Sequence, residues 1–144
     1  MYDLMIIGSG PAGISAALTA KARNLNFIWF GSRALSTKIE KAEKIMNYPG
    51  LPAVTGSEMQ SVFLKQIDDC GITITESQVN SIYDCGGYFA AGADNEIYEA
   101  KAVIMTVGMT TTREIEGEAR LLGCGVSYCA TCDGALYKLS LIHI

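Results

Sequence analysis

Two cysteines have a spacing that suits redox chemistry: Cys129 and Cys132, with Asp133 directly after them. The two intervening residues place both sulfurs within one helical turn, and the dipole at a helix N-terminus favours the thiolate, which lowers a cysteine's pKa. Such a pair cycles between dithiol and disulfide with little backbone movement. Asp133 can carry a proton to or from a departing thiolate. The pattern therefore predicts a redox-active pair in which all three residues have catalytic roles.

Metal binding is the main alternative for these cysteines. A single C-x-x-C can form half of a zinc site, but no second such pair follows, and the one histidine, His143, lies near the chain end. The spacing of Cys124, Cys129 and Cys132 also matches part of a plant-type iron–sulfur motif, without a fourth cysteine downstream. The leading hypothesis is therefore the redox pair, with no metal site. Two alternatives stay open. One is a metal or iron–sulfur module on these three cysteines, and the other is an oxidoreductase whose cysteine pair is idle.

A glycine fingerprint near the N-terminus is the second chemical signal. The segment Gly8-Ser9-Gly10-Pro11-Ala12-Gly13 matches G-x-G-x-x-G. In this pattern the first glycine allows a tight turn, the second lets the backbone approach a pyrophosphate, and the third lets helix and strand pack closely. The phosphate is held by exposed N–H groups at the helix N-terminus. Because the match follows an expected strand and opens an expected helix, it predicts dinucleotide binding.

The fingerprint alone does not choose between FAD and NADP. The acidic residue expected about 20 positions further on is missing, since no Asp or Glu lies between Asp3 and Glu40. The second strand instead runs into Gly31, Ser32 and Arg33. Arg33 can either face a 2′-phosphate, which would favour NADP, or be an ordinary solvated loop residue.

The elements that position these motifs are read from apolar runs and turn residues. A buried strand over 3–8, a helix over 11–23 and a strand over 26–30 give a β–α–β opening. A capping box at Thr55 predicts a helix with Met59, Val62, Phe63 and Ile67 on one face. Further expected elements follow in chain order: a strand over 72–75, an antiparallel meander over 79–100, a buried strand over 102–107, a crossing over 110–120 and a helix over 129–137.

Composition excludes several classes. The chain has 144 residues, of which 49% are hydrophobic and 18% charged, which predicts a packed core rather than disorder. The net charge is −4 and no Lys/Arg-rich run exists, so we predict no nucleic-acid partner. No apolar stretch approaches the roughly 20 residues of a membrane helix, and the N-terminus has no secretory pattern. The default expectation is a cytoplasmic protein with no membrane partner.

Taken together, these motifs resemble the low-molecular-weight thioredoxin reductases, the class II flavoprotein pyridine nucleotide-disulfide oxidoreductases. The glycine segment resembles that family's FAD fingerprint. Three further segments resemble family motifs: Asn47-Tyr48-Pro49-Gly50 with Thr55-Gly56, Thr106-Val107-Gly108, and the run from Gly125 through Cys129-Ala130-Thr131-Cys132 to Gly134. The resemblance covers roughly residues 1–138. It implies an α/β, Rossmann-like FAD/NAD(P)-binding fold with a parallel sheet and a small antiparallel β-meander, here incomplete.

The resemblance also implies an activity. Reduced FAD would pass electrons to the Cys129–Cys132 disulfide, and the dithiol would reduce thioredoxin or a similar protein. By position, Cys132 resembles the cysteine next to the flavin, Cys129 the one that attacks the partner, and Asp133 the acid that assists exchange. The resemblance moves the choice of dinucleotide to FAD, with these cofactor-binding residues: Gly8, Ser9, Gly10, Pro11, Ala12, Gly13, Gly31, Asn47, Val79, Thr106 and Gly108. The intact parent would be a homodimer that uses NADPH.

The chain departs from the family pattern in two places. Residues 32–38 replace the usual Gly-Gly-Gln segment, and residues 139–144 match nothing in the family, where a strand and a second glycine fingerprint for NADPH would follow. We therefore expect 1–112 to be the first segment of a split FAD domain and 113–144 the start of an inserted redox domain. Such a piece should lack turnover, expose apolar patches and dissolve poorly. The electron donor, NADPH or another, stays open.

Overall fold

The computed structural model describes residues 1–108, 116–121 and 124–126. Contacts divide the chain into two units, Met1–Ser36 with Ser61–Met109, and Thr37–Gln60 with Thr110–Ile144. The elements in chain order are β1 (Tyr2–Ile7), α1 (Pro11–Ala22), β2 (Phe27–Phe30), α2 (Thr37–Glu40), α3 (Gly56–Asp69), β3 (Val79–Asp84), β4 (Phe89–Ala93), β5 (Glu96–Met105) and α4 (Glu118–Leu121). The predicted division at residue 112 lies outside the described residues and stays a prediction.

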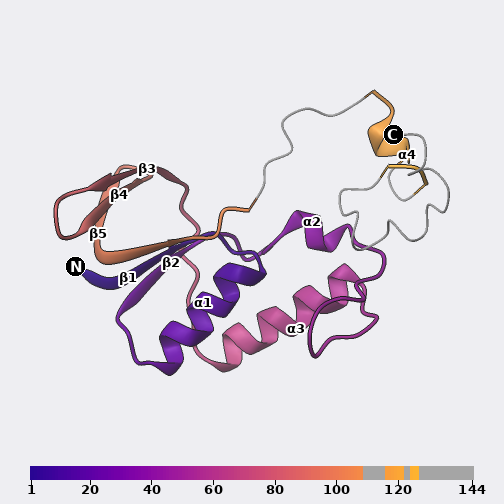
Figure 1. Ribbon diagram of the computed structural model, residues 1–144, viewed down its shortest axis with the longest axis horizontal. Coiled ribbons are helices and arrows are strands. Elements are labelled where there is room, and N and C mark those ends of the chain that lie inside the picture. The colour runs from indigo at the N-terminus through magenta and orange to yellow at the C-terminus, as the bar shows by residue number, and fades with distance from the viewer. Residues whose placement is uncertain (109–115, 122–123, 127–144) are drawn as a thin grey trace. The chain divides into compact units, whose positions relative to one another are not determined.

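The first unit contains a five-stranded sheet in the order β2-β1-β5-β4-β3 (Figure 1). Strand β1 pairs in parallel with both β2 and β5, whereas β4 pairs antiparallel with β3 and with β5. The predicted α/β class, with a parallel sheet and an antiparallel meander, is confirmed. The meander and the following strand were expected as separate elements, and this was wrong: β5 is one ten-residue strand that pairs with β4 through 96–100 and with β1 through 100–105.

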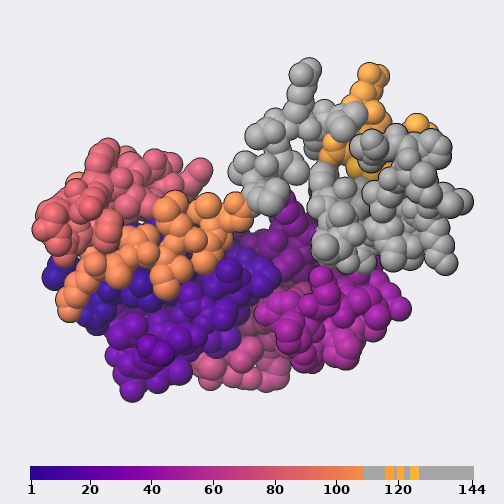
Figure 2. Space-filling model, in the orientation of Figure 1, coloured from indigo at the N-terminus to yellow at the C-terminus, as the bar shows by residue number. Residues whose placement is uncertain are grey.

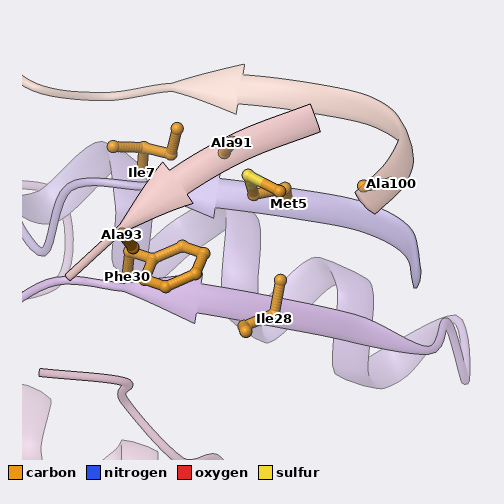
Figure 3. Close-up of a cluster of buried hydrophobic side chains, with 7 residues drawn as sticks. All are labelled: Met5, Ile7, Ile28, Phe30, Ala91, Ala93 and Ala100. Carbon is orange, nitrogen blue, oxygen red and sulfur yellow. The ribbon is translucent and has the colours of Figure 1, made fainter. Parts of the chain in front are cut away.

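The core of this unit lies between the parallel strands and the meander. Met5 and Ile7 of β1, together with Ile28 and Phe30 of β2, meet three small residues on β4 and β5 (Figure 3): Ala91, Ala93 and Ala100. The small side chains on the meander leave room for the large ones on the parallel strands. On their other face, β1 and β2 carry buried Leu4, Ile6 and Trp29, while α1 contacts β1 and buries Ile14, Ala17 and Ala20. Both faces of β1 are therefore covered.

Helix α3 begins at the predicted capping box. The Thr55 backbone N–H donates to Glu58 Oε2 (2.8 Å), and the Glu58 N–H donates to Thr55 Oγ1 (3.2 Å). Met59, Phe63 and Ile67, spaced four residues apart, are buried as predicted. Val62 was also assigned to this face, which was wrong: it is 44% exposed. Met59, Phe63 and Ile67 occupy positions i, i+4 and i+8, which form a row that winds gradually around the helix. Val62 lies beside this row, on the more exposed side.

Two expected strands differ from prediction. Residues 72–75 form only a parallel bridge from Thr75 to Phe30, with Thr75 N–H donating to the Trp29 carbonyl (2.7 Å). The strand over 102–107 was expected to be buried, but Ile104, Met105 and Val107 are 40%, 62% and 61% exposed. The reason is topological: in the described residues, no strand pairs with the far side of this stretch of β5. Its orange atoms lie at the surface in Figure 2.

The second unit is described through α2, the loop before α3, and α4. The Ile45 N–H donates to the Val54 carbonyl (2.7 Å), which closes the loop that contains the Asn47-Tyr48-Pro49-Gly50 turn. Gly56 is required where α3 starts, because a Cβ there would overlap the carbonyl oxygen of Ile39. The helix expected over 129–137 lies outside the described residues. Within the described part, no helix is both long and apolar enough to cross a membrane.

Candidate dinucleotide-binding site

The turn between β1 and α1 requires the glycines of the fingerprint. Gly8 has a φ of +114°, and a Cβ there would overlap the backbone of Thr106, while a Cβ at Gly13 would overlap the carbonyl oxygen of Gly8. A Cβ at Gly10, by contrast, would meet nothing within 4 Å. The three positions thus match the tight turn, the open approach and the close helix–strand contact that dinucleotide binding needs. Open space thus lies beside Gly10, as a bound pyrophosphate would require.

The N-terminus of α1 presents donors at the same place. Gly10 is the N-cap residue with no side-chain capping hydrogen bond, and Pro11 follows as the first helical residue. The first helical hydrogen bond runs from the Ile14 N–H to the Gly10 carbonyl (3.0 Å). Helix geometry therefore leaves the N–H groups of Ala12 and Gly13 without an intrahelical acceptor. Together with the positive end of the helix dipole, they suit a phosphate anion.

The Gly8 carbonyl oxygen accepts hydrogen bonds from two side chains. Trp29 Nε1 donates to this oxygen at 2.8 Å, and Thr106 Oγ1 lies 3.1 Å from it and 2.9 Å from the Ile7 carbonyl oxygen. Thr106 was predicted as a cofactor-binding residue, and the structure places its hydroxyl against the backbone of the glycine turn. Sequence reasoning missed Trp29. The available signal was a single tryptophan in an apolar strand, since a buried indole N–H needs an acceptor.

Ser9 connects the glycine turn to the loop that follows β2. Its buried hydroxyl donates to the Leu35 carbonyl (3.1 Å) and accepts the N–H of Ser32 (3.0 Å). Gly31 lies against it, because a Cβ at Gly31 would come within 2.5 Å of the Ser9 Cβ. Ser9 and Gly31, both predicted as site residues, are therefore brought together.

Arg33 follows in the same loop and is engaged by acidic residues. Its guanidinium makes two hydrogen bonds to the Asp68 carboxylate, at 3.1 and 3.0 Å, and its backbone N–H donates to Glu76 Oε1 (2.7 Å). The hydrogen bonds raise the pKa of Arg33 and lower the pKa of Asp68. The side chain is thus an ion-pair partner of Asp68.

The other predicted site residues are more dispersed. Val79 begins β3 and packs half-buried against the core cluster. Gly108 is exposed, with a φ of +67°. Asn47 is exposed and belongs to the second unit, so the structure does not place it relative to the glycine turn. Cys129, Cys132 and Asp133 lie outside the described residues.

The metal alternative needs Cys124 together with Cys129 and Cys132, of which the structure describes only Cys124. Cys124, which the metal alternative needs, is exposed as a free thiol, and so is Cys85, while Cys70 is half-buried. Among the residues that the structure describes, no group of three or more His, Cys, Asp or Glu side chains is arranged to hold a metal ion.

The parallel β1–α1–β2 unit, with its glycine turn and uncapped helix N-terminus, defines a Rossmann-like dinucleotide-binding fold. The family model described as pyridine nucleotide-disulphide oxidoreductase matches residues 2–143, and the chain belongs to that family. Within it, several similar proteins are thioredoxin reductases. The thioredoxin reductase of Bacillus subtilis is 32% identical over 139 residues, which cover 96% of this chain and 44% of the relative. The chain spans less than half the length of the curated relatives it matches.

Similar solved structures also belong to thioredoxin reductases. A ferredoxin-flavin thioredoxin reductase from Clostridium acetobutylicum is 48% identical, with a TM-score of 0.75 over 94% of this chain and 47% of that one. Thioredoxin reductase from Streptococcus pyogenes is 35% identical, with a TM-score of 0.79 over 94% of this chain and 45% of that one. These similarities cover 94–96% of the chain, so the predicted resemblance to low-molecular-weight thioredoxin reductases is confirmed.

Proposed function

We propose that this chain supplies the FAD-binding segment and the redox cysteines of a flavoprotein that reduces protein disulfides. The observation that carries the proposal is the glycine turn, whose Gly10 is open to a ligand while Gly8 and Gly13 are closely packed. The family and the thioredoxin reductase relatives support the same assignment. The substrate in this proposal is the disulfide of thioredoxin or of a thioredoxin-like protein.

The residues of the turn have separate tasks in this proposal. The N–H groups of Ala12 and Gly13 bind the pyrophosphate, and Gly10 lets it approach. Trp29 and Thr106 bind the carbonyl of Gly8 and so hold the backbone of the turn in place. When bound, FAD supplies the electron pair that reduces the cysteine disulfide.

The thiol chemistry belongs to the segment outside the described residues and rests on the sequence. The Cys129 thiolate attacks the partner's disulfide, and one partner sulfur leaves as a thiolate that takes a proton from Asp133. Cys132 then attacks the mixed disulfide and releases the partner as a dithiol. Two electrons pass to the partner, and the Cys129–Cys132 disulfide re-forms.

The electron donor of the whole protein has two candidates. NADPH is expected from the general family pattern. The Clostridium acetobutylicum structure, whose name includes ferredoxin, shares 48% identity with the chain, compared with 35% for the Streptococcus pyogenes enzyme. Because of this higher identity, we include a ferredoxin-type donor as the second candidate. We propose a homodimeric, cytoplasmic whole protein in either case.

The test is purification of the chain followed by an absorption spectrum with added FAD, a metal analysis and an NADPH-dependent disulfide reduction assay. We expect weak FAD binding, no stoichiometric zinc or iron, and no turnover, because the chain spans less than half of its relatives. Sustained NADPH turnover by the chain alone would contradict its role as a partial enzyme.

Bound iron or zinc on the cysteines would favour the metal module. In a full-length homologue, unchanged activity after serine replaces the cysteines equivalent to Cys129 and Cys132 would show that the pair is idle.

A further inference from the structure

The loop after β2 is held on two sides. From the glycine turn, Ser9 binds the backbone of Ser32 and Leu35 (3.0 and 3.1 Å). From the opposite side, Asp68 of α3 binds the guanidinium of Arg33, and Glu76 binds its backbone N–H. In Rossmann-like folds the adenosine ribose lies at this end of the second strand. A loop at this position is therefore the one expected to face the ribose.

Arg33 is the one basic residue between Arg23 and Lys38 in the sequence, and hence the one cation in this loop. Its planar guanidinium meets the two oxygens of Asp68 at 3.1 and 3.0 Å, a fork-to-carboxylate geometry that a phosphate would otherwise take. Arg33, Asp68 and Glu76 together carry one net negative charge. A ribose 2′-phosphate would have to displace Asp68 and lie beside two carboxylates, whereas a 2′-hydroxyl meets no such repulsion.

We propose that the Arg33–Asp68 pair, with Glu76, makes this site selective for dinucleotides whose adenosine ribose carries a free 2′-hydroxyl. The inference rests on the proposed FAD site and adds its specificity determinant. It assigns Arg33 the opposite role from that of a 2′-phosphate receptor, because the pair of N–H donors that would form a fork on a phosphate already binds Asp68. Removing the Asp68 charge should release that edge.

The experiment compares two probes that differ only in the 2′-phosphate: ADP-ribose and 2′-phospho-ADP-ribose. Their affinities for the 144-residue chain are measured by isothermal titration calorimetry or amide NMR shifts. The wild-type chain should prefer ADP-ribose. In Asp68→Asn this preference should fall by about two- to fivefold, the size expected for freeing one partner of an exposed ion pair. Glu76→Gln should act in the same direction but less.

A matched control lies one residue away. Asp69 forms an exposed i,i+4 pair with Lys65 on the same helix, so Asp69→Asn removes the same charge without touching Arg33. It should leave the preference unchanged, and thermal unfolding should show that all three variants fold.

The outcomes distinguish a failure of the specificity proposal from a failure of the proposed FAD site. If ADP-ribose binds but Asp68→Asn and Asp69→Asn leave the preference equally unchanged, or change it equally, the specificity proposal is overturned and the FAD site stands. If neither probe binds the wild-type chain at millimolar concentration, the dinucleotide site itself is overturned, and the specificity proposal with it.

Discussion

Strands β1 and β5 are neighbours with similar apolar sequences and very different surroundings. Ile6 pairs in register with Ile104, and Ile7 with Met105. The two residues on β1 are 0% and 8% exposed, whereas their partners on β5 are 40% and 62% exposed. Strand β1 lies between two strands and is covered on both faces, whereas the described residues contain no strand beyond this half of β5. Burial here depends on neighbours more than on residue type.

The largest expected effect concerns the turn that closes β1. Gly13→Ala should destabilise the fold by about 3 kcal/mol or more, because the added Cβ meets the Gly8 carbonyl oxygen and backbone cannot move aside cheaply. Gly10→Ala is the matched control, since its Cβ enters open space. It should fold normally and weaken dinucleotide binding only. Urea unfolding checks both variants, and equal stabilities would contradict the assigned roles of the glycines.

The register pair Ile6 and Ile104 tests the comparison directly. Ile6→Ala should cost about 3 kcal/mol, because it leaves a cavity in a fully enclosed position. Ile104→Ala should cost less than about 1 kcal/mol, because its side chain is already largely in water. The measurement is the free energy of unfolding of each variant in urea. Similar losses at both positions would mean that β5 is covered after all.

Thr106 sharpens the comparison, because it lies just beyond β5 and yet serves the turn after β1. Thr106→Val should cost about 1–2 kcal/mol, since it keeps the shape but removes the hydroxyl that the carbonyls of Ile7 and Gly8 share. Thr106→Ser retains the hydroxyl and should restore most of the loss, together with the affinity for ADP-ribose. Calorimetric unfolding and nucleotide titration would check this, and a serine variant as weak as the valine variant would point to packing instead.

The smallest effect concerns the charge that links the two strands. Lys101 Nζ of β5 lies 2.7 Å from Asp3 Oδ1 of β1, and this hydrogen bond, with that from the Asn26 N–H, lowers the pKa of Asp3. A lowered carboxyl pKa stabilises the fold above the unfolded value of 3.8, and this stabilisation is lost as the pH falls through the lower folded value. Asp3→Asn should therefore flatten the stability profile below about pH 4. An unchanged acid profile would show that the pair contributes nothing.

Local patterns predicted the local structure. The apolar run, proline and glycines at the start of the chain fixed β1, the turn and α1, and the spacing of Thr55 and Glu58 fixed the start of α3. These features depend on residues only a few positions apart. The roles predicted for Gly8, Gly10 and Gly13 agree with the geometry for the same reason.

Features that depend on distant residues were not predictable in this way. A continuous apolar run reads the same whether or not another strand covers it, so the exposure of Met105 was missed. The hydrogen bond from Trp29 to Gly8 and the pairing of Arg33 with Asp68 join residues 21 and 35 positions apart. No local spacing signals such contacts, and the cysteine chemistry still rests on the sequence alone.

We propose that the glycine turn holds the pyrophosphate of a dinucleotide. The most direct measurement is an amide NMR titration of the chain with ADP-ribose. We expect the largest shifts at the N–H groups of Gly10, Ala12 and Gly13 and smaller shifts at Ser32 and Arg33. Gly10→Ala should reduce them all. Binding that leaves these amides unmoved, or no binding at millimolar ADP-ribose, would contradict it.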